Sequence, residues 1–241
     1  MATVPETAAR GDKTRDALIR AAIEAFGREG FAAASTRTIA ETAGVNQALI
    51  GYHFGGKPGL YAAALTQIAT VVRERMTPIL AELDTAVGLG PVFDAATPAA
   101  IAIRRTTDEA TSTDCIAALH RLLDAFVVMV TSDESAPWAR LILREQQDPT
   151  PGFDILYDGI MRPLIGATTA LIGRIRDCDP ASETARLLAI TILAQALIFR
   201  MARAAVTRQM AWPTIGTAEV RAIQVQVRRN ATAILMQEAT A

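Results

Sequence analysis

The feature that most constrains the fold of this 241-residue chain is the segment from Ser35 to Lys57, STRTIAETAGVNQALIGYHFGGK. Ser35 can cap a short helix, and Gly44 supplies the positive φ angle that ends such a helix. Asn46 can cap the helix that follows. Two helices of about two turns each, joined by a short turn containing glycine, predict a helix-turn-helix whose second helix lies in a DNA groove.

A longer amphipathic helix is predicted before this segment, over residues 12–29. Apolar side chains recur every four positions from Leu18 to Phe26, and Gly30 follows as the terminator. The apolar stripe of this helix needs a partner, which the apolar residues of the helix-turn-helix supply. Residues 12–57 are therefore predicted to form a three-helix DNA-binding domain.

Residues 1–11, MATVPETAARG, are small and polar and predict a mobile arm. Insertion of Arg10 into the minor groove is the alternative interpretation of this arm. The chain as a whole carries a net charge of −1, which argues against a polycation that coats DNA without selection. Residues 1–60 hold seven Lys or Arg against six Asp or Glu, so helix N-termini and polar contacts must supplement charge at any DNA surface.

Residues 58–241 are predicted to form a larger helical domain. The hydrophobic share of 51% with only 5% aromatic residues favours an all-α fold. A long helix opens at Lys57 and runs towards Leu83, with a kink or an end near Thr77 because of Pro78. A loop is expected over 84–98. Further helices are expected near 99–110, 113–132, 135–147, 153–177, 181–208 and 217–238.

Small or polar side chains on the second helix suit contact with DNA. Gln or Asn can pair with adenine, Ala can pack on a thymine methyl group, and Tyr or His can donate to phosphate. The alternatives are a solvated surface charge for Arg37 and a structural hydrogen bond for His53. The predicted DNA contacts are Arg37, Thr38, Asn46, Gln47, Ala48, Tyr52, His53 and Lys57.

Residues 14–65 resemble the DNA-binding domain of TetR-family transcription regulators, through ALIRAAIEAFGREGF, STRTIAETAGV and YHFGGKPGLY. The chain departs from the family pattern at Gly51, where a phosphate-contacting Tyr usually stands, and Tyr52 is the expected substitute. The motifs GVNQALIGYHFGGKPGLY, REQQDPTPGFDILYDGIMRPL and ILAQALIFRMARAAV are similar to the CecR-like branch of the family. The resemblance implies an all-helical dimer, a ligand cavity in the C-terminal body, and repression relieved by a small molecule.

The run LLAITILAQALIF, residues 187–199, is apolar around nearly its whole circumference and must be covered on all sides. A homodimer, with residues 217–238 as the second interface helix, would cover it and would match a palindromic operator in double-stranded DNA. Burial within one monomer is the alternative. Adaptable Met and aromatic residues suit an apolar effector, although each can also be plain core. The candidate effector contacts are Phe126, Met129, Trp138, Phe153, Tyr157 and Met161.

The function predicted from these patterns is a homodimeric repressor that a small-molecule effector releases from its operator. A repressor or activator without effector control is the alternative, and an α-helical enzyme is disfavoured because the sequence holds two His and no GxSxG or HExxH motif. No cofactor or metal is expected. Cys115 and Cys178 are interpreted as structural thiols, with redox sensing as the alternative. The 13-residue apolar run is shorter than a membrane span, and no signal peptide is evident, so a cytoplasmic protein without membrane contact is expected.

Overall fold

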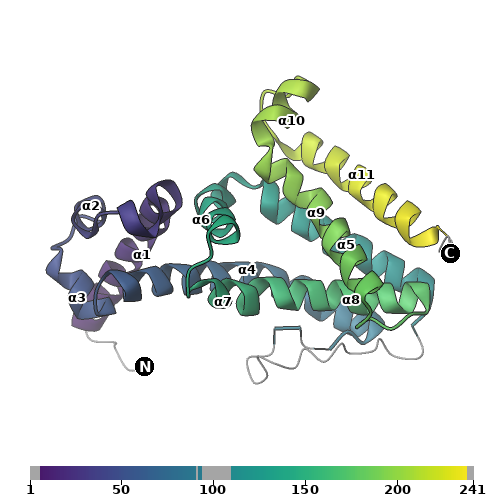
Figure 1. Cartoon of the computed structure of the whole chain (residues 1–241), viewed down its shortest axis with the longest axis horizontal. Helices are drawn as coiled ribbons and strands as arrows, with labels where there is room; N and C mark the ends of the chain where they lie inside the picture. Colours follow the sequence, from purple (N-terminus) through teal and green to yellow (C-terminus); the bar gives the residue numbers. More distant parts are fainter. Residues whose placement is uncertain (1–5, 91, 94–109, 238–241) are drawn as a thin grey trace. The chain divides into compact units, whose positions relative to one another are not determined.

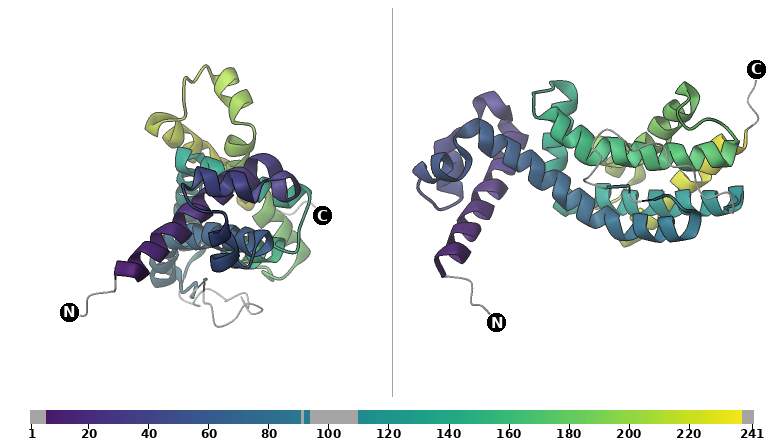
Figure 2. Two further views of the ribbon diagram at one scale, coloured as in Figure 1. Left: turned by 90° about the vertical axis from the view of Figure 1, so that its left-hand side faces the viewer. Right: turned by 90° about the horizontal axis from the view of Figure 1, so that it is seen from below.

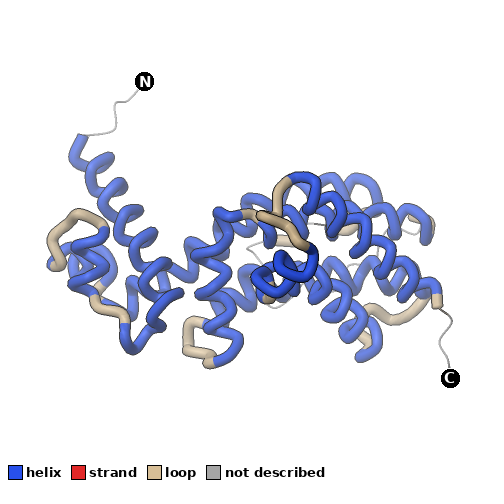
Figure 3. The backbone as a smooth tube through the Cα atoms, turned by 90° about the horizontal axis from the view of Figure 1, so that it is seen from above, coloured by secondary structure: helices blue, strands red, loops and turns tan. Residues whose placement is uncertain are grey.

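The computed structural model describes residues 6–90, 92–93 and 110–237, and these residues form helices and connecting turns without a strand (Figures 1 and 3). The predicted all-α fold is confirmed. The helix expected near 99–110 lies outside the described residues except for Ala110. The elements are α1 (Glu6–Ala33), α2 (Thr36–Thr42), α3 (Ala48–Phe54), α4 (Lys57–Val87), α5 (Ser112–Thr131), the 3-10 turn η1 (Asp133–Ser135), α6 (Ala136–Gln147), α7 (Phe153–Leu156), the π-helical turn η2 (Tyr157–Met161), α8 (Arg162–Arg176), α9 (Glu183–Met201), α10 (Arg203–Met210) and α11 (Thr217–Met236).

Several element boundaries differ from the sequence prediction, and one of them is the end of α4 at Val87, since a loop was expected from residue 84. Residues 6–11 belong to α1 rather than to a mobile arm, since alanine and arginine favour a helix there. Helix α4 continues through Pro78 instead of ending near Thr77, and the Thr77 hydroxyl donates to the carbonyl oxygen of Arg73 at 2.8 Å. The helix expected over 181–208 is divided at Ala202 into α9 and α10.

The chain forms two compact units. Unit 1 takes in the described residues up to Val71 together with Ala136–Gly159, and unit 2 takes in Val72–Ser135 and the residues from Ile160 onward. Unit 1 is therefore discontinuous in sequence. Its second segment, which holds α6 and α7, lies within the part of the sequence predicted as the larger C-terminal domain.

The helices α1 to α3 of unit 1 bury one apolar face each against the start of α4. Large side chains from all four helices expose at most 2% of their surface, namely Leu18, Phe26, Ile39, Ile50 and Leu60. The ring of Phe26 meets the ring of Tyr61 edge-on at 4.8 Å between centroids. This shared core fixes the helix-turn-helix against α1 and α4.

Helix α6 packs along α1 within unit 1. The two helices approach closely at Gly27, where a Cβ atom would lie 3.1 Å from the carbonyl oxygen of Pro137. The guanidinium of Arg140 pairs with Glu24 at 3.0 Å, and Arg144 donates to the carbonyl oxygen of Arg28 at 3.2 Å. The first helix of the predicted DNA-binding domain thus packs against a helix more than a hundred residues later in the chain.

A buried carboxylate joins α6 to the start of α4. The side chain of Glu145 is fully buried and accepts hydrogen bonds from the Tyr61 hydroxyl, from the Thr150 amide at 3.1 Å and from the Thr150 hydroxyl at 3.0 Å. Burial and the adjacent carboxylate raise the pKa of Tyr61 well above its ordinary value, so the phenol stays protonated and remains a donor. The network satisfies a charge that would be costly to bury without partners.

Unit 2 is built around α5, which packs against α8, α9 and α11 (Figures 1 and 2). The interior of this bundle holds Leu119, Leu122, Leu171, Ile192 and Val227. Cys115 is buried among these helices as predicted, while Cys178 is half-buried, and neither forms a disulfide.

Within the part of the chain that the structure describes, two helical stretches are long and apolar enough to cross a membrane by length and composition, Phe153–Arg176 and Glu183–Met201. The prediction counted only the uninterrupted apolar run of 13 residues and therefore underestimated the length of α9, which has 19 residues. In the first stretch 56% of the most apolar window is buried inside the protein, whereas in α9 only 28% is buried. Helix α9 consequently leaves much of its apolar surface uncovered in a single chain.

Candidate nucleic-acid interface

The turn between α2 and α3 is set by the capping residues that the sequence predicted. The Ser35 hydroxyl accepts from the amide of Thr38 at 3.5 Å, and Gly44 ends the first helix with a φ angle of 69°. The Asn46 side chain accepts from the amide of Ala48 at 2.8 Å, which opens α3. These local contacts fix the direction in which α3 leaves the turn.

Helix α3 has one buried face and one open face. Ile50 is 2% exposed and anchors the helix in the core of unit 1. Ala48 and Gly51 are exposed on the other face, and Tyr52 exposes 82% of its surface. No atom lies within 4 Å of a Cβ built on Gly51. The open face is therefore shallow, with Tyr52 as its long side chain.

Two predicted base-contacting residues already have partners within the motif. The side-chain amide of Gln47 donates to the Thr36 hydroxyl at 3.0 Å, which ties the start of α3 to the start of α2. The Asn46 carboxamide oxygen is used in the cap, although the residue remains exposed. Gln47 and Asn46 can thus orient the recognition helix as well as face DNA.

The two predicted contacts on α2 are exposed. Thr38 lies on the outer surface, and the Arg37 guanidinium pairs with Glu41 one turn later at 2.8 Å. The Arg37 side chain is 79% exposed. An exposed pair of this kind contributes little to stability. A phosphate could therefore compete with Glu41 for this guanidinium at small cost.

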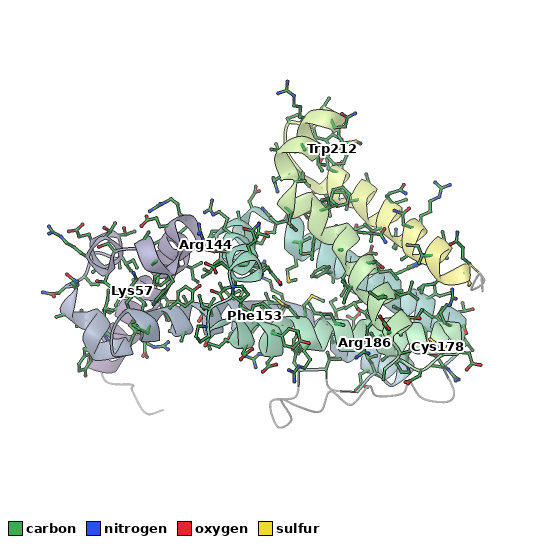
Figure 4. All side chains as sticks on the ribbon, viewed as in Figure 1. Lys57, Arg144, Phe153, Cys178, Arg186 and Trp212 are labelled. Carbon is green, nitrogen blue, oxygen red and sulfur yellow. The ribbon has the colours of Figure 1, made fainter. Side chains whose placement is uncertain are left out.

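Lys57, at the first position of α4, turns towards the end of α1 (Figure 4). Its ammonium donates to the carbonyl oxygen of Ala32 at 3.0 Å and lies 5.1 Å from the ring centre of Phe31. This contact ties the start of α4 to α1 and was not foreseen from the sequence. The predicted phosphate contact of Lys57 would have to share the ammonium with Ala32.

The junction of α3 and α4 is packed tightly around Phe54. A Cβ atom added at Gly59 would overlap the carbonyl oxygen of Phe54, so a larger residue there requires the end of α3 to shift. The guanidinium of Arg15 lies 5.6 Å from the ring centre of Phe54, and this cation–π contact was not predictable from the sequence. His53 is half-buried, with its ring 5.0 Å from Tyr52 and 6.1 Å from Phe54.

The six candidate effector contacts divide between the two units. Phe126 and Met129 are buried on α5, and Met161 closes η2, all within unit 2. The remaining three, Trp138, Phe153 and Tyr157, belong to unit 1, where the rings of Phe153 and Tyr157 stack at 6.0 Å. Their assignment to an effector site stays a prediction.

An apolar face runs along the outside of α9 in unit 2. Its members recur at helical spacing and expose between 37% and 57% of their surface, namely Leu187, Ile190, Leu197, Ile198 and Met201. Helix α11 also carries exposed apolar residues, Val225 at 54% and Met236 at 61%. We call the five residues of α9 the α9 apolar face. It is a continuous surface of the kind that another protein chain covers.

The comparisons with known proteins identify the family. Residues 18–64 match the model of bacterial regulatory proteins of the tetR family, and residues 115–237 match the C-terminal domain of the HTH-type transcriptional dual regulator CecR. The second match takes in 123 of the 241 residues. The chain is a TetR-family transcriptional regulator with a CecR-type C-terminal domain. The predicted helix-turn-helix and the predicted membership of the CecR-like branch are both confirmed.

Individual relatives agree with this assignment. The regulator is 28% identical over 209 residues to the HTH-type transcriptional dual regulator CecR of Shigella flexneri, over 86% of this chain and 85% of that protein. A TetR-like transcriptional regulator from a Rhodococcus species has a similar fold, with a TM-score of 0.59, 18% identity and coverage of 93% of this chain and 97% of that one. The fatty acid degradation regulator FadR of Bacillus halodurans is similar at a TM-score of 0.56 and 15% identity, over 92% and 98% of the two chains.

Proposed function

We propose that this DNA-binding regulator acts as a homodimer on a palindromic operator and that a small-molecule effector releases it. The observation that carries the dimer is the α9 apolar face, which leaves side chains such as Ile190 about half exposed on a helix whose most apolar window is only 28% buried. A twofold arrangement would cover this face with its own counterpart and present two copies of α3 to the two half-sites.

The DNA contacts are proposed on the open face of α3 and on the exposed side of α2. Ala48 and Gly51 allow the helix backbone to approach the base edges, and the Tyr52 hydroxyl can donate to phosphate. Arg37 and Thr38 are proposed to contact the DNA backbone as α2 crosses it. Residues 12–57 form the proposed DNA-binding domain, and residues 58–241 the proposed dimerisation and effector domain.

The remaining predicted contacts have positioning roles within the motif, which gives only limited support to a direct contact of these residues with DNA. Asn46, Gln47 and Lys57 each hold another part of unit 1, so their loss would change the aim of α3 even without a lost DNA contact. His53 lies between two aromatic rings and is proposed to support Tyr52. Tyr52 is accordingly the residue on which a direct test should be made.

The proposed effector site lies in the helical body. Two buried acceptor oxygens in the described part of unit 2, one on Asp124 and one on Gln195, have no hydrogen-bond partner. Buried acceptors of this kind are usually satisfied, so they favour an effector that brings a hydrogen-bond donor as well as apolar surface. A regulator of this family without catalytic activity, acting in the cytoplasm, is the simplest function consistent with these features.

The proposal can be tested in three measurements on the full-length protein. Sedimentation should give a dimer at micromolar concentration. A mobility-shift assay on the DNA upstream of its own gene should show a palindromic site, and compounds that raise the melting temperature should weaken that binding in proportion to their affinity. A monomer would refute the homodimer, and operator binding unaffected by every stabilising compound would refute effector control.

A further inference from the structure

The turn between α5 and α6 is where the chain passes from unit 2 to unit 1. Helix α5 ends at Thr131, which is 2% exposed, and Ser135 in the following turn is fully buried. The last carbonyl groups of a helix lack partners within the helix. Because this end of α5 is buried, those carbonyl oxygens need donors from other elements.

Arg200, in the last turn of α9, donates to one of these carbonyl oxygens and to two acceptors in the turn that follows. Its guanidinium donates to the carbonyl oxygen of Val130 at 2.5 Å, to the hydroxyl of Ser135 at 2.7 Å, and to the carbonyl oxygen of Ser132. Burial lowers the pKa of Arg200, and the nearby Arg203 adds to this effect. A planar guanidinium donates from several nitrogen atoms in a fixed plane, whereas the three donors of an ammonium all belong to one nitrogen atom on a flexible stem.

Two further arginines hold the same turn from other helices. Arg203, at the start of α10, donates to the carbonyl oxygen of Thr131 at 2.9 Å and pairs with Asp133 at 2.9 Å. Arg75 on α4 pairs with Glu134 at 2.5 Å. The turn is thus held by Arg75, Arg200 and Arg203, and all three residues belong to unit 2.

The clamp formed by Arg200 and Arg203 lies next to the α9 apolar face. Ile198 and Met201 flank Arg200 in the same helical turn and expose 48% and 57% of their surface. Any chain that covers this face therefore presses on the turn of α9 that carries the clamp. On the other side of the clamp, the chain continues from Ser135 directly into α6, which packs on α1 in unit 1.

We propose that Arg200 and Arg203 are positioning residues that couple coverage of the α9 apolar face by a second copy to the α5–α6 turn, and so to operator affinity. The inference rests on the proposed homodimer. A rotation of the last turn of α9 moves three rigidly held acceptors at once, and the turn carries that displacement to the start of α6. The coupling needs no contact between the arginines and DNA.

The test compares three variants with wild type on a DNA duplex that the wild-type protein enriches from a random pool. Arg200→Lys keeps the positive charge but loses the planar guanidinium, and Asp133→Ala removes the ion-pair partner of Arg203 while the Thr131 carbonyl oxygen remains. Arg186→Lys is the control at the exposed start of α9 (Figure 4). We expect both clamp variants to dimerise as wild type does and to bind the duplex on the order of tenfold more weakly. The control should bind as wild type does.

Hydrogen exchange gives a readout that a merely structural role would not change. In wild type, the amides of residues 132–135 should gain protection when the protein concentration is raised through dimer formation, and this gain should be lost in the clamp variants. Wild-type affinity per folded dimer in both variants, or an unchanged gain in protection, would overturn the coupling. If Arg200→Lys does not fold, Asp133→Ala decides, because the Asp133 side chain is 86% exposed. A monomeric wild-type protein would instead refute the proposed homodimer.

Discussion

Replacing Gly59 with alanine should separate the folding of this regulator from its recognition of DNA. Gly59 lies in the first turn of α4, and its φ angle is outside the left-handed region, so only space opposes a larger side chain. The new Cβ atom would overlap the carbonyl oxygen of Phe54 and lie 3.0 Å from its carbonyl carbon. Phe54 is the last residue of α3, the helix proposed to enter the DNA groove.

The size of the effect follows from this distance. A carbon atom and a carbonyl oxygen in contact lie about 3.3 Å apart, so relief of the overlap with the Phe54 carbonyl oxygen requires the end of α3 to retreat by roughly 1.5 Å. Overpacking of this kind costs about 1–3 kcal/mol, and the better helix propensity of alanine returns up to about 1 kcal/mol. A hydrogen bond to DNA lengthened by the same amount is largely lost, and each lost base contact costs about 1–3 kcal/mol. Operator binding should therefore fall by about tenfold or more while the protein remains folded.

Gly11→Ala is the matched control, because Gly11 lies in α1 and no atom is within 4 Å of its added Cβ. Fluorescence anisotropy with a labelled operator duplex measures the affinity, and circular dichroism with thermal unfolding measures the folded fraction. The control should bind as wild type does and unfold at the same or a slightly higher temperature. If Gly59→Ala also bound the operator with wild-type affinity, α3 would not be the recognition helix, or its aim would not depend on Phe54.

Three further predictions concern other parts of the regulator. Lys57→Met should lower the free energy of unfolding by about 1 kcal/mol in urea denaturation, because it removes the hydrogen bond to Ala32, and it should leave the salt dependence of operator binding unchanged. A slope shallower by about 1.8, from one phosphate contact in each protomer of the dimer, would show a phosphate contact instead. Ile190→Asp should convert the dimer into monomers in sedimentation and weaken operator binding, and a dimer of undiminished stability would exclude the α9 apolar face as the interface. Burial, with a smaller effect of Arg228, lowers the pKa of His120 below its ordinary 6.5, so protonation of His120 favours the unfolded chain. The contribution of His120 to stability should therefore be complete above about pH 6.5 and decline below it. His120→Gln should reduce this decline when urea denaturation is measured at pH 7.5 and at pH 5.5.

The helix-turn-helix was predictable because its signals are local. Ser35, Gly44 and Asn46 act on backbone groups a few residues away, and residue type and spacing are enough to recognise such contacts. The same holds for the apolar periodicity that marks the buried face of α1. The family resemblance rests on these short-range patterns, and for that reason it was visible in one sequence.

The long-range polar contacts were not predictable from the sequence. The pairing of Glu24 with Arg140 spans 116 positions, and the contact of Lys57 with Ala32 spans 25. An apolar stripe indicates that a helix needs a partner, but it does not indicate which helix that partner is, and a charged side chain has many possible partners. The proposed DNA contacts were affected for the same reason, since the tie between Gln47 and Thr36 depends on how two helices meet.

The discontinuity of unit 1 limits how such regulators can exchange parts by recombination. A chimaera joined at residue 57 would place α1 of this protein against α6 of another, although Gly27 and Glu24 are matched to Pro137 and Arg140 of its own α6. Transfer of this DNA-binding domain to the C-terminal domain of another regulator would therefore succeed most readily when α6 is transferred with it. In the regulator itself, the DNA-binding segment and α6 belong to one compact unit that two separate stretches of the gene encode.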